Sequence, residues 1–397
     1  MVHKIKTGLD IISQNVGWQQ KITGNIGYLC HSASVDENLY FGVDRLKELF
    51  GKRLVKLFGP QHGFVTDVQD NMIETNDYLH PYYKIPVHSL YSQTRTPTAE
   101  MLEGIDTLII DLQDVGCRIY TYAHTMTLTM EACHKNNVKV VILDRPNPVG
   151  GELIEGNILE PEFRSFVGRH PVPVRHGMTM GELALFCQKF HGVDCELQII
   201  KMEGWRRNML FKETGLTWVN PSPNLPTTEG CDIFPGTVLL EGCNLSEGRG
   251  TTRPLEVIGH PSIEPHSFLQ TTMKQLEKTT LEGYLLRPIV FHPMFQKHAN
   301  KSCGGFHIHI TNHHTAQPWK LVQMLMKVFK QELGSDFSWK NDGYEYQFEK
   351  PAIDFINGTD KLRKWIDDNG DFQELAIFEE EGKREFETNR KEILLYS

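Results

Sequence analysis

Short apolar runs bounded by Gly, Pro, Asn and Asp recur through the first 150 residues and alternate with longer segments of helical periodicity. The runs predict strands at 26–30, 54–58, 87–90, 107–112 and 138–143. Helices are predicted at 40–49 and 120–135, and a further helix is expected to begin at Thr96 and Pro97, with Thr96 as N-cap. This alternation implies right-handed crossovers in an α/β fold with a Rossmann-like, doubly wound parallel sheet.

From about residue 256 the pattern changes to longer mixed segments. A strand is predicted at 305–310, an amphipathic helix at 319–333, and a charged tail at 378–392. A chain of 397 residues is also too long for one ordinary core. We therefore predict a Rossmann-like catalytic domain over 1–255 and a smaller C-terminal α+β domain over 256–397.

The charge and the cysteines narrow the classes of partner. With 41 basic and 50 acidic residues the net charge is −9, which argues against nonspecific binding to nucleic acid or to an anionic membrane. The eight cysteines show no Cys-x-x-Cys pair, which favours free thiols in a reducing compartment. No secretory apolar region and no run of about 18 apolar residues is present. We expect a cytoplasmic protein, or a secreted or periplasmic one if a leader was removed, and leave the oligomeric state open.

Polar residues follow the predicted strands, at the edge of an open α/β sheet where ligands bind. They are Gln61, His62, Tyr91, Asp111, Gln113, Asp114, Asp144, Arg145 and Asn147. We expect a shared site there, although capping or local ion pairs are alternatives for the aspartates, and a simple turn for Asn147. No Gly-x-Gly-x-x-Gly follows the first strand and no phosphate loop is present, so no cofactor is expected.

The segment 241–254 (EGCNLSEGRGTTRP) combines carboxylates, guanidinium groups and glycines. We expect it to lie outside the core. Glycines permit close approach of the backbone to a ligand, and Arg249 and Arg253 suit a carboxylate or phosphate. The segment predicts a binding loop for a polar, anionic small molecule. A solvated turn with structural ion pairs is the alternative.

Several of these motifs together resemble one known family. They are 58–63 (FGPQHG), 111–116 (DLQDVG), 120–122 (YTY), 143–148 (LDRPNP), 173–179 (PVRHGMT) and 241–254. They are similar to motifs of the exo-β-N-acetylmuramidase (NamZ-type) glycoside hydrolases, long catalogued as a domain of unknown function, and the resemblance covers nearly the whole chain. It implies release of terminal N-acetylmuramic acid from the non-reducing end of peptidoglycan fragments, with a smaller C-terminal domain beside the cleft.

One position departs from the family pattern. Many members carry Glu where this chain has Gln61, and that Glu is the favoured catalytic carboxylate. An amide cannot act as acid or base in its place. Glu74, in the nearby segment 69–74, is predicted to take over the role, and Asn71 of the same segment is predicted to contact the substrate. The competing interpretation is a noncatalytic or differently reactive binder of an anionic amino sugar.

Glycoside cleavage normally uses two carboxyl groups, one protonated and one ionised. Glu247 is our first choice for the second carboxylate, followed by Asp114 and Glu241. The alternative for Glu247 is that it only holds Arg249 or Arg253 in place. His62 is predicted to line the site, where it would bond a substrate hydroxyl or orient a carboxylate.

The lactyl group of muramic acid carries a carboxylate, so the resemblance implies a cationic receptor. Arg249, Arg253 and Arg145 are the candidates. The other predicted substrate contacts are Gln61, Tyr91, Arg118, Tyr120, Asn147, Arg175 and His176. His307 and His309 share a strand face but have no acidic or cysteine partner at ligand spacing, so no metal is expected. An oxidoreductase on the same scaffold is a weaker alternative, because the glycine-rich cofactor signatures are missing.

Overall fold

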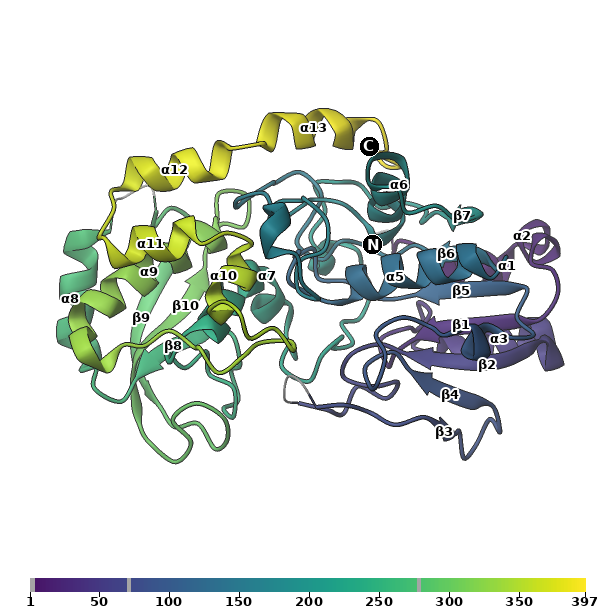
Figure 1. The fold of residues 1–397 in the computed structure, drawn as a ribbon, viewed down its shortest axis with the longest axis horizontal. Coiled ribbons are helices and arrows are strands. Elements are labelled where there is room, and N and C mark those ends of the chain that lie inside the picture. The colour runs from purple at the N-terminus through teal and green to yellow at the C-terminus, as the bar shows by residue number, and fades with distance from the viewer. Residues whose placement is uncertain (1–3, 70–72, 277–279) are drawn as a thin grey trace.

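A computed structural model describes residues 4–69, 73–276 and 280–397. It has two lobes, each built around its own β-sheet (Figure 1). The larger lobe holds a seven-stranded sheet with helices on both faces, and the smaller lobe holds a three-stranded sheet. Within these described ranges, no helix is long and apolar enough to cross a membrane.

The large sheet has the strand order β3-β4-β2-β1-β5-β6-β7 and is parallel except for β3. Its strands are β1 (Ile26–Cys30), β2 (Leu54–Gly59), β3 (Tyr78–Leu79), β4 (Pro86–Ser89), β5 (Thr107–Asp111), β6 (Lys139–Leu143) and β7 (Leu197–Ile200). The chain order reverses between β1 and β5, which is the topological switch point of a doubly wound sheet. The predicted Rossmann-like fold and its five strands are confirmed.

Local sequence explains where the helices begin. Thr179 caps α6 through a reciprocal capping box with Glu182. The helix predicted at Thr96 begins instead at Ala99, because Thr98 is the residue whose hydroxyl accepts the Met101 N–H, at 3.2 Å. The helices of the large lobe are α1 (Gly8–Gln14), α2 (Val16–Lys21), α3 (Gly42–Phe50), α4 (Ala99–Leu102), α5 (Tyr122–Lys135) and α6 (Met180–His191).

The smaller lobe is an antiparallel sheet, β8-β10-β9, covered by helices. Its strands are β8 (Val257–His260), β9 (Tyr284–Phe291) and β10 (Cys303–Ile310), and the covering helices are α8 (Pro265–Gln275) and α9 (Pro318–Leu333). Phe268, Phe306 and Phe329 stack where these helices meet β10. Helix α7 (Thr228–Thr237) precedes the predicted domain boundary yet packs against α9 and β10.

The C-terminal segment, which includes the predicted charged tail, forms helices. They are α10 (Ala352–Asn357), α11 (Lys361–Asp367), α12 (Phe372–Glu380) and α13 (Lys383–Lys391). Figure 1 shows α12 and α13 running from the smaller lobe to α6 of the larger one. The chain end is fixed there, since the Tyr396 hydroxyl donates to Asp144 Oδ2 at 2.6 Å.

Candidate active site

A small pocket, partly open to solvent, lies where the two lobes meet. Its polar lining comes from the loop after β2, the loop before α5, the loop before α7, the segment 241–249 and a loop of the C-terminal part of the chain. These lining residues are Gln61, His62, Tyr120, Thr121, Ser222, Glu241, Arg249, Tyr344 and Glu345. The pocket therefore collects five of the residues predicted from sequence: Gln61, His62, Tyr120, Glu241 and Arg249.

Gln61 meets a carboxylate that the sequence analysis did not select. Its Nε2 lies 3.3 Å from Glu345 Oε1, and its Oε1 accepts the Thr121 hydroxyl at 2.6 Å. The hydroxyl of Tyr91 lies 2.8 and 2.9 Å from the two carboxylate oxygens of Glu345. Burial raises the pKa of Glu345, although the bond from Tyr91 and the charge of Arg95 oppose the shift. A carboxyl with a raised pKa therefore lines the pocket beside position 61.

Three consecutive residues of the C-terminal part reach the pocket and its rim. The Tyr344 hydroxyl donates to Glu241 Oε2 at 2.6 Å, and the Tyr346 hydroxyl donates to Glu74 Oε1 at 2.9 Å. Glu345, between them, faces Gln61. Both Glu345 and Tyr346 have positive φ, 47° and 64°, which turns adjacent side chains toward different partners.

Arg249 lies between two carboxylates. Its Nη2 donates to Glu241 Oε1 at 2.5 Å, and its Nε lies 3.2 Å from Glu247 Oε1. Lys297 Nζ binds the other oxygen of Glu247 at 2.8 Å. Burial alone would raise the pKa of Glu247, but the charges of Lys297 and Arg249 bring it below its ordinary value. Neither Nη1 nor Nε of the buried Arg249 has a hydrogen-bond partner among the described residues, although Nε lies within ion-pair distance of Glu247.

Most of the glycine-rich segment, from 241 to 249, is buried, contrary to the prediction that it lies outside the core, whereas Thr252 and Arg253 are exposed. Glu241, Glu247 and Arg249 are each at most 6% exposed. Gly248 and Gly250 have positive φ, and a Cβ at either position would collide with β8 or with the backbone of Phe295. The glycines thus let the segment approach protein rather than a ligand, and the ion pairs of its charged residues make burial possible.

Glu247 does not face the pocket. Together with Lys297 and Trp339 it lines a neighbouring cavity, which shares Glu241 and Tyr344 with the pocket. Its contacts match the alternative in which it holds Arg249 in place. Of the predicted second carboxylates, Glu241 is the one that lines the pocket.

His62 is held as a neutral ring. Its Nδ1 lies 2.9 Å from the carbonyl oxygen of Val68, which can only accept, so Nδ1 carries the proton and Nε2 is an acceptor. Burial lowers the pKa of His62 to about 4, and the charge of Arg249 contributes. His62 therefore offers the pocket an acceptor rather than a positive charge at neutral pH.

Glu74 and Arg253 lie outside the described lining of the pocket. The side chain of Glu74 is 44% exposed, and its Oε1 lies 3.8 Å from Arg95. Arg253 is 52% exposed and pairs with Glu256. Asn71 falls outside the described residues. Tyr91 contacts the pocket only through Glu345.

Asp114 and His176 form a buried pair behind the pocket. Asp114 Oδ2 accepts the Gly116 N–H at 2.7 Å and lies 3.8 Å from His176 Nε2. Burial raises the pKa of Asp114 to about 7 and lowers that of His176 to about 3. Neither residue belongs to the lining formed by the described residues.

Three further predicted contacts bind backbone groups instead. Arg118 donates to four carbonyl oxygens, those of residues 157, 172, 356 and 357. Arg175 donates to the carbonyl of residue 149. Asn147 binds the N–H of residue 149 and the carbonyl of residue 178, which shapes a turn, as its alternative interpretation proposed. These side chains support the loops around the site.

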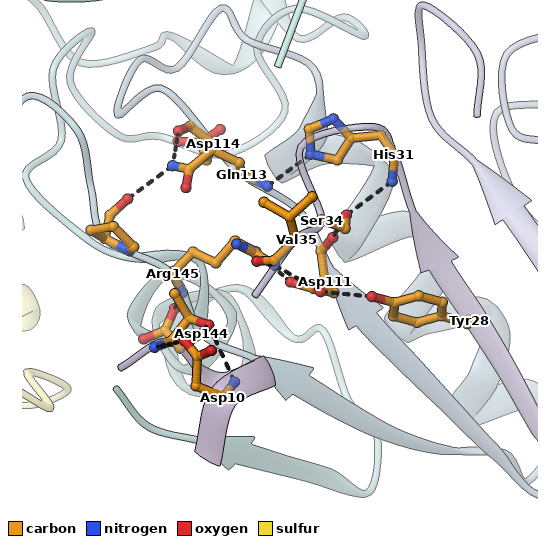
Figure 2. Close-up of polar contacts among 12 residues, drawn as sticks. Asp10, Tyr28, His31, Ser34, Val35, Asp111, Gln113, Asp114, Asp144 and Arg145 are labelled. Atoms are coloured by element: carbon orange, nitrogen blue, oxygen red, sulfur yellow. Dashed lines mark hydrogen bonds and ion pairs between the residues drawn. The ribbon is translucent and has the colours of Figure 1, made fainter. Parts of the chain in front are cut away.

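Arg145 lies at the switch point, where a buried polar network occupies the crevice (Figure 2). Its guanidinium forms two bonds with Asp111 and a third with the carbonyl of Val35. The Tyr28 hydroxyl also donates to Asp111, at 2.7 Å. Gln113 donates its backbone N–H to His31 Nε2 at 3.0 Å. These protein groups pair with one another at the position where other doubly wound folds bind a ligand, beside a small pocket that Val35, Gln113 and Arg145 help to line.

The sequence analysis missed Tyr344 and Glu345. It looked for the site at strand ends, whereas these residues lie in an irregular loop of the smaller lobe, 284 positions from Gln61 in the case of Glu345. The available signal was local: a glutamate between two tyrosines in a segment, GYEYQ at 343–347, without strand or helix periodicity. Among the described residues, no group of three or more His, Cys, Asp or Glu could hold a metal ion.

Comparison with known proteins identifies the family. The model described as "Exo-beta-N-acetylmuramidase NamZ, N-terminal" matches residues 26–229, and the one described as "Exo-beta-N-acetylmuramidase NamZ, C-terminal" matches residues 233–396. The chain is 38% identical over 394 residues to the peptidoglycan beta-N-acetylmuramidase NamZ of Bacillus subtilis (strain 168), covering 99% of this chain and 92% of that protein. These matches place the protein among the glycoside hydrolases. The chain belongs to the exo-beta-N-acetylmuramidase NamZ family.

Two solved structures share the fold. Both are DUF1343 family proteins of Bacteroides fragilis NCTC 9343, and each comparison covers 99% of both chains. One has a TM-score of 0.86 at 28% identity, and the other a TM-score of 0.74 at 26% identity. The match extends over both lobes.

Proposed function

We propose that the protein hydrolyses the glycosidic bond of terminal N-acetylmuramic acid at the non-reducing end of peptidoglycan fragments. Family membership supports the reaction class. The observation that carries the proposal is the pocket itself, which places two carboxyl groups and a buried arginine N–H around one space. Glycoside hydrolysis requires two such carboxyl groups on either side of the scissile bond.

Arg249 is the proposed receptor for the lactyl carboxylate. Its Nη2 donates to Glu241, and its Nε lies 3.2 Å from Glu247 in an ion pair without a hydrogen bond. Its Nη1 has no hydrogen-bond partner among the described residues. A substrate carboxylate would satisfy this buried donor. A glucosamine derivative, which lacks the lactyl group, would leave it unpaired, and an unpaired buried donor costs about 1–3 kcal/mol.

Glu241 is the proposed second carboxylate. It lines the pocket, and Arg249 and Tyr344 donate to its two oxygens. These contacts compensate its negative charge and fix its position, as a group that stabilises an oxocarbenium-like centre or directs a water requires. The remaining requirement is a proton donor, because Gln61 cannot fill that role.

A pair of matched chromogenic substrates tests the proposal. We expect release of chromophore from a β-N-acetylmuramide and at least about tenfold lower kcat/KM for the corresponding β-N-acetylglucosaminide, since 1.4 kcal/mol corresponds to a factor of ten. Arg249→Lys should reduce the ratio of kcat/KM for the muramide to kcat/KM for the glucosaminide. Lysine lacks the planar guanidinium group, so it has no donor fixed in the position of Arg249 Nη1. Saturable binding of the muramide without release would contradict hydrolysis and favour the sugar-binding alternative.

A further inference from the structure

We propose that Glu345, on the loop of the smaller lobe, is the proton donor of the reaction and replaces the carboxyl group missing at position 61. This inference rests on the proposed function. It assigns the acid to a residue from the other lobe, so that a complete site requires both lobes.

The first argument is position. Glu345 Oε1 lies 3.3 Å from Gln61 Nε2, so the carboxyl group reaches the space next to the side chain at position 61. The Thr121 hydroxyl, 2.6 Å from the amide oxygen, keeps the nitrogen directed at Glu345. In this arrangement an amide and a carboxylate are neighbours, whereas two carboxylates at the same separation would repel one another.

The second argument is environment. Glu345 is 4% exposed and lines the pocket. Burial raises its pKa, which increases the fraction that is protonated at neutral pH, as a general acid requires. Its nearest polar contacts are Tyr91 and Gln61, and the Gln61 amide nitrogen can only donate. The acidic proton therefore cannot be directed at the Gln61 nitrogen, which leaves the Tyr91 hydroxyl oxygen or an acceptor in the pocket to receive it.

The third argument is that Glu74, the acid predicted from sequence, has an exposed environment and contacts that differ from those of Glu345. Its carboxylate is 44% exposed and accepts the Tyr346 hydroxyl at 2.9 Å. The Arg95 guanidinium is stacked between the rings of Tyr91 and Tyr346, at 4.0 and 4.9 Å from their centroids, and lies 3.8 Å from Glu74. Glu74 thus belongs to a contact that holds the loop at Tyr346.

The reaction step follows from this placement. Glu345 gives its proton to the glycosidic oxygen as the bond from C1 to that oxygen breaks, and the bonding electron pair remains on the departing hydroxyl. One water supplies the hydroxyl group that C1 gains. The remaining proton of that water restores the carboxyl pair, so hydrolysis consumes one water and leaves the enzyme unchanged.

Leaving-group dependence separates an acid from a structural residue. A sugar leaving group needs protonation, whereas a nitrophenolate departs with little assistance. Glu345→Gln should therefore lower kcat about 100-fold or more on an N-acetylmuramyl-N-acetylglucosamine disaccharide and far less on nitrophenyl β-N-acetylmuramide. Glu349→Gln, at an exposed position four residues further along the chain, is the matched control and should leave both rates within about twofold. Retained activity of Glu345→Gln on the disaccharide would overturn the inference.

A reciprocal swap provides the second test. The variant Gln61→Glu with Glu345→Gln returns the carboxyl group to position 61 and keeps one acid and one amide in contact. We expect its kcat on the disaccharide to be at least about tenfold higher than that of Glu345→Gln alone. Its thermal unfolding midpoint should be close to that of the wild type. An equal loss on both substrates in Glu345→Gln, without recovery in the swap, would mean that Glu345 is structural. Inactivity of the wild-type protein on both substrates would instead refute the proposed function.

Discussion

At the scale of single residues, the central feature is a carboxyl group contributed by a distant part of the chain. Tyr344, Glu345 and Tyr346 contact Glu241, Gln61 and Glu74 in turn. The φ values of Glu345 and Tyr346 lie in a region that residues other than glycine seldom adopt. Each such residue costs of order 1–3 kcal/mol, and the contacts of the three side chains offset that cost.

The hydrogen bond from Tyr91 gives a pH-dependent prediction. This bond stabilises the carboxylate and so opposes the raised pKa of Glu345. Removing it in Tyr91→Phe should raise that pKa further. The activity of an acid catalyst falls as pH rises through its pKa, so the alkaline limb of the kcat profile should move to higher pH. Tyr82→Phe, at a site 79% exposed, is the control and should leave the profile unchanged. A shift to lower pH would contradict the assignment.

The site residues could be predicted from sequence where the chemistry follows a strand. Gln61 and His62 lie directly after β2, so the Rossmann rule placed them correctly beside the pocket. Glu345 could not be found in this way, because its position depends on how the smaller lobe docks. Arg145 follows β6 just as regularly, yet the structure pairs it with Asp111. A strand-end position alone does not distinguish a ligand contact from a buried ion pair.

At the scale of elements, the alternation of apolar runs defined the large sheet, because each parallel strand is buried and short. It did not reveal β3, whose residues are exposed, or β7 at the sheet edge, where three of the four residues are only partly buried. The glycine-rich segment shows a second way in which a prediction from sequence can fail. Its composition is typical of a solvated loop, but three cation–carboxylate contacts allow it to be buried. Such pairing depends on the tertiary structure, so the composition of the segment does not reveal it.

A buried carboxyl group between elements gives a prediction about stability. Burial, and then the charge of Glu379 on α12, raise the pKa of Glu155 to about 8, and its Oε2 has no hydrogen-bond partner in the described structure. Its pKa in the unfolded chain is about 4.3. The folded state therefore binds the proton more tightly, and stability is lost as pH rises from about 5 to 8, by at most about 1.4 kcal/mol per pH unit.

Glu155→Gln should remove this loss. Urea unfolding between pH 5 and 8 should show a flatter dependence on pH for the variant than for wild type. Glu152→Gln, at an exposed position three residues earlier, should keep the wild-type dependence. Equal slopes for Glu155→Gln and wild type would show that Glu155 is ionised in the folded protein at neutral pH.

At the scale of the whole molecule, the two lobes are joined by more than the pocket. The C-terminal helices span both lobes (Figure 1), and the chain end binds the larger one. Arg390 donates to the carbonyls of Gly151 and Gly177, and Tyr396 donates to Asp144. Because the proposed acid belongs to the smaller lobe, these contacts help to hold the geometry of the site.

Tyr396→Phe tests this connection. The variant leaves Asp144 without one of its donors, and a hydrogen bond to a charged group contributes about 1.5–3 kcal/mol. The urea midpoint should fall, with an unchanged slope if unfolding stays cooperative. Tyr40→Phe, at a site 57% exposed, should not change the midpoint. An unchanged midpoint in Tyr396→Phe would mean that the chain end contributes little to the docking of the lobes.

The most direct measurement is a crystal structure of the Glu345→Gln variant with a bound N-acetylmuramyl disaccharide. Our account predicts the glycosidic oxygen within about 3.2 Å of the amide at position 345, as a proton donor requires, and the lactyl carboxylate on Arg249 Nη1. A sugar bound with its glycosidic oxygen against Glu74 or Glu247, and away from position 345, would contradict it.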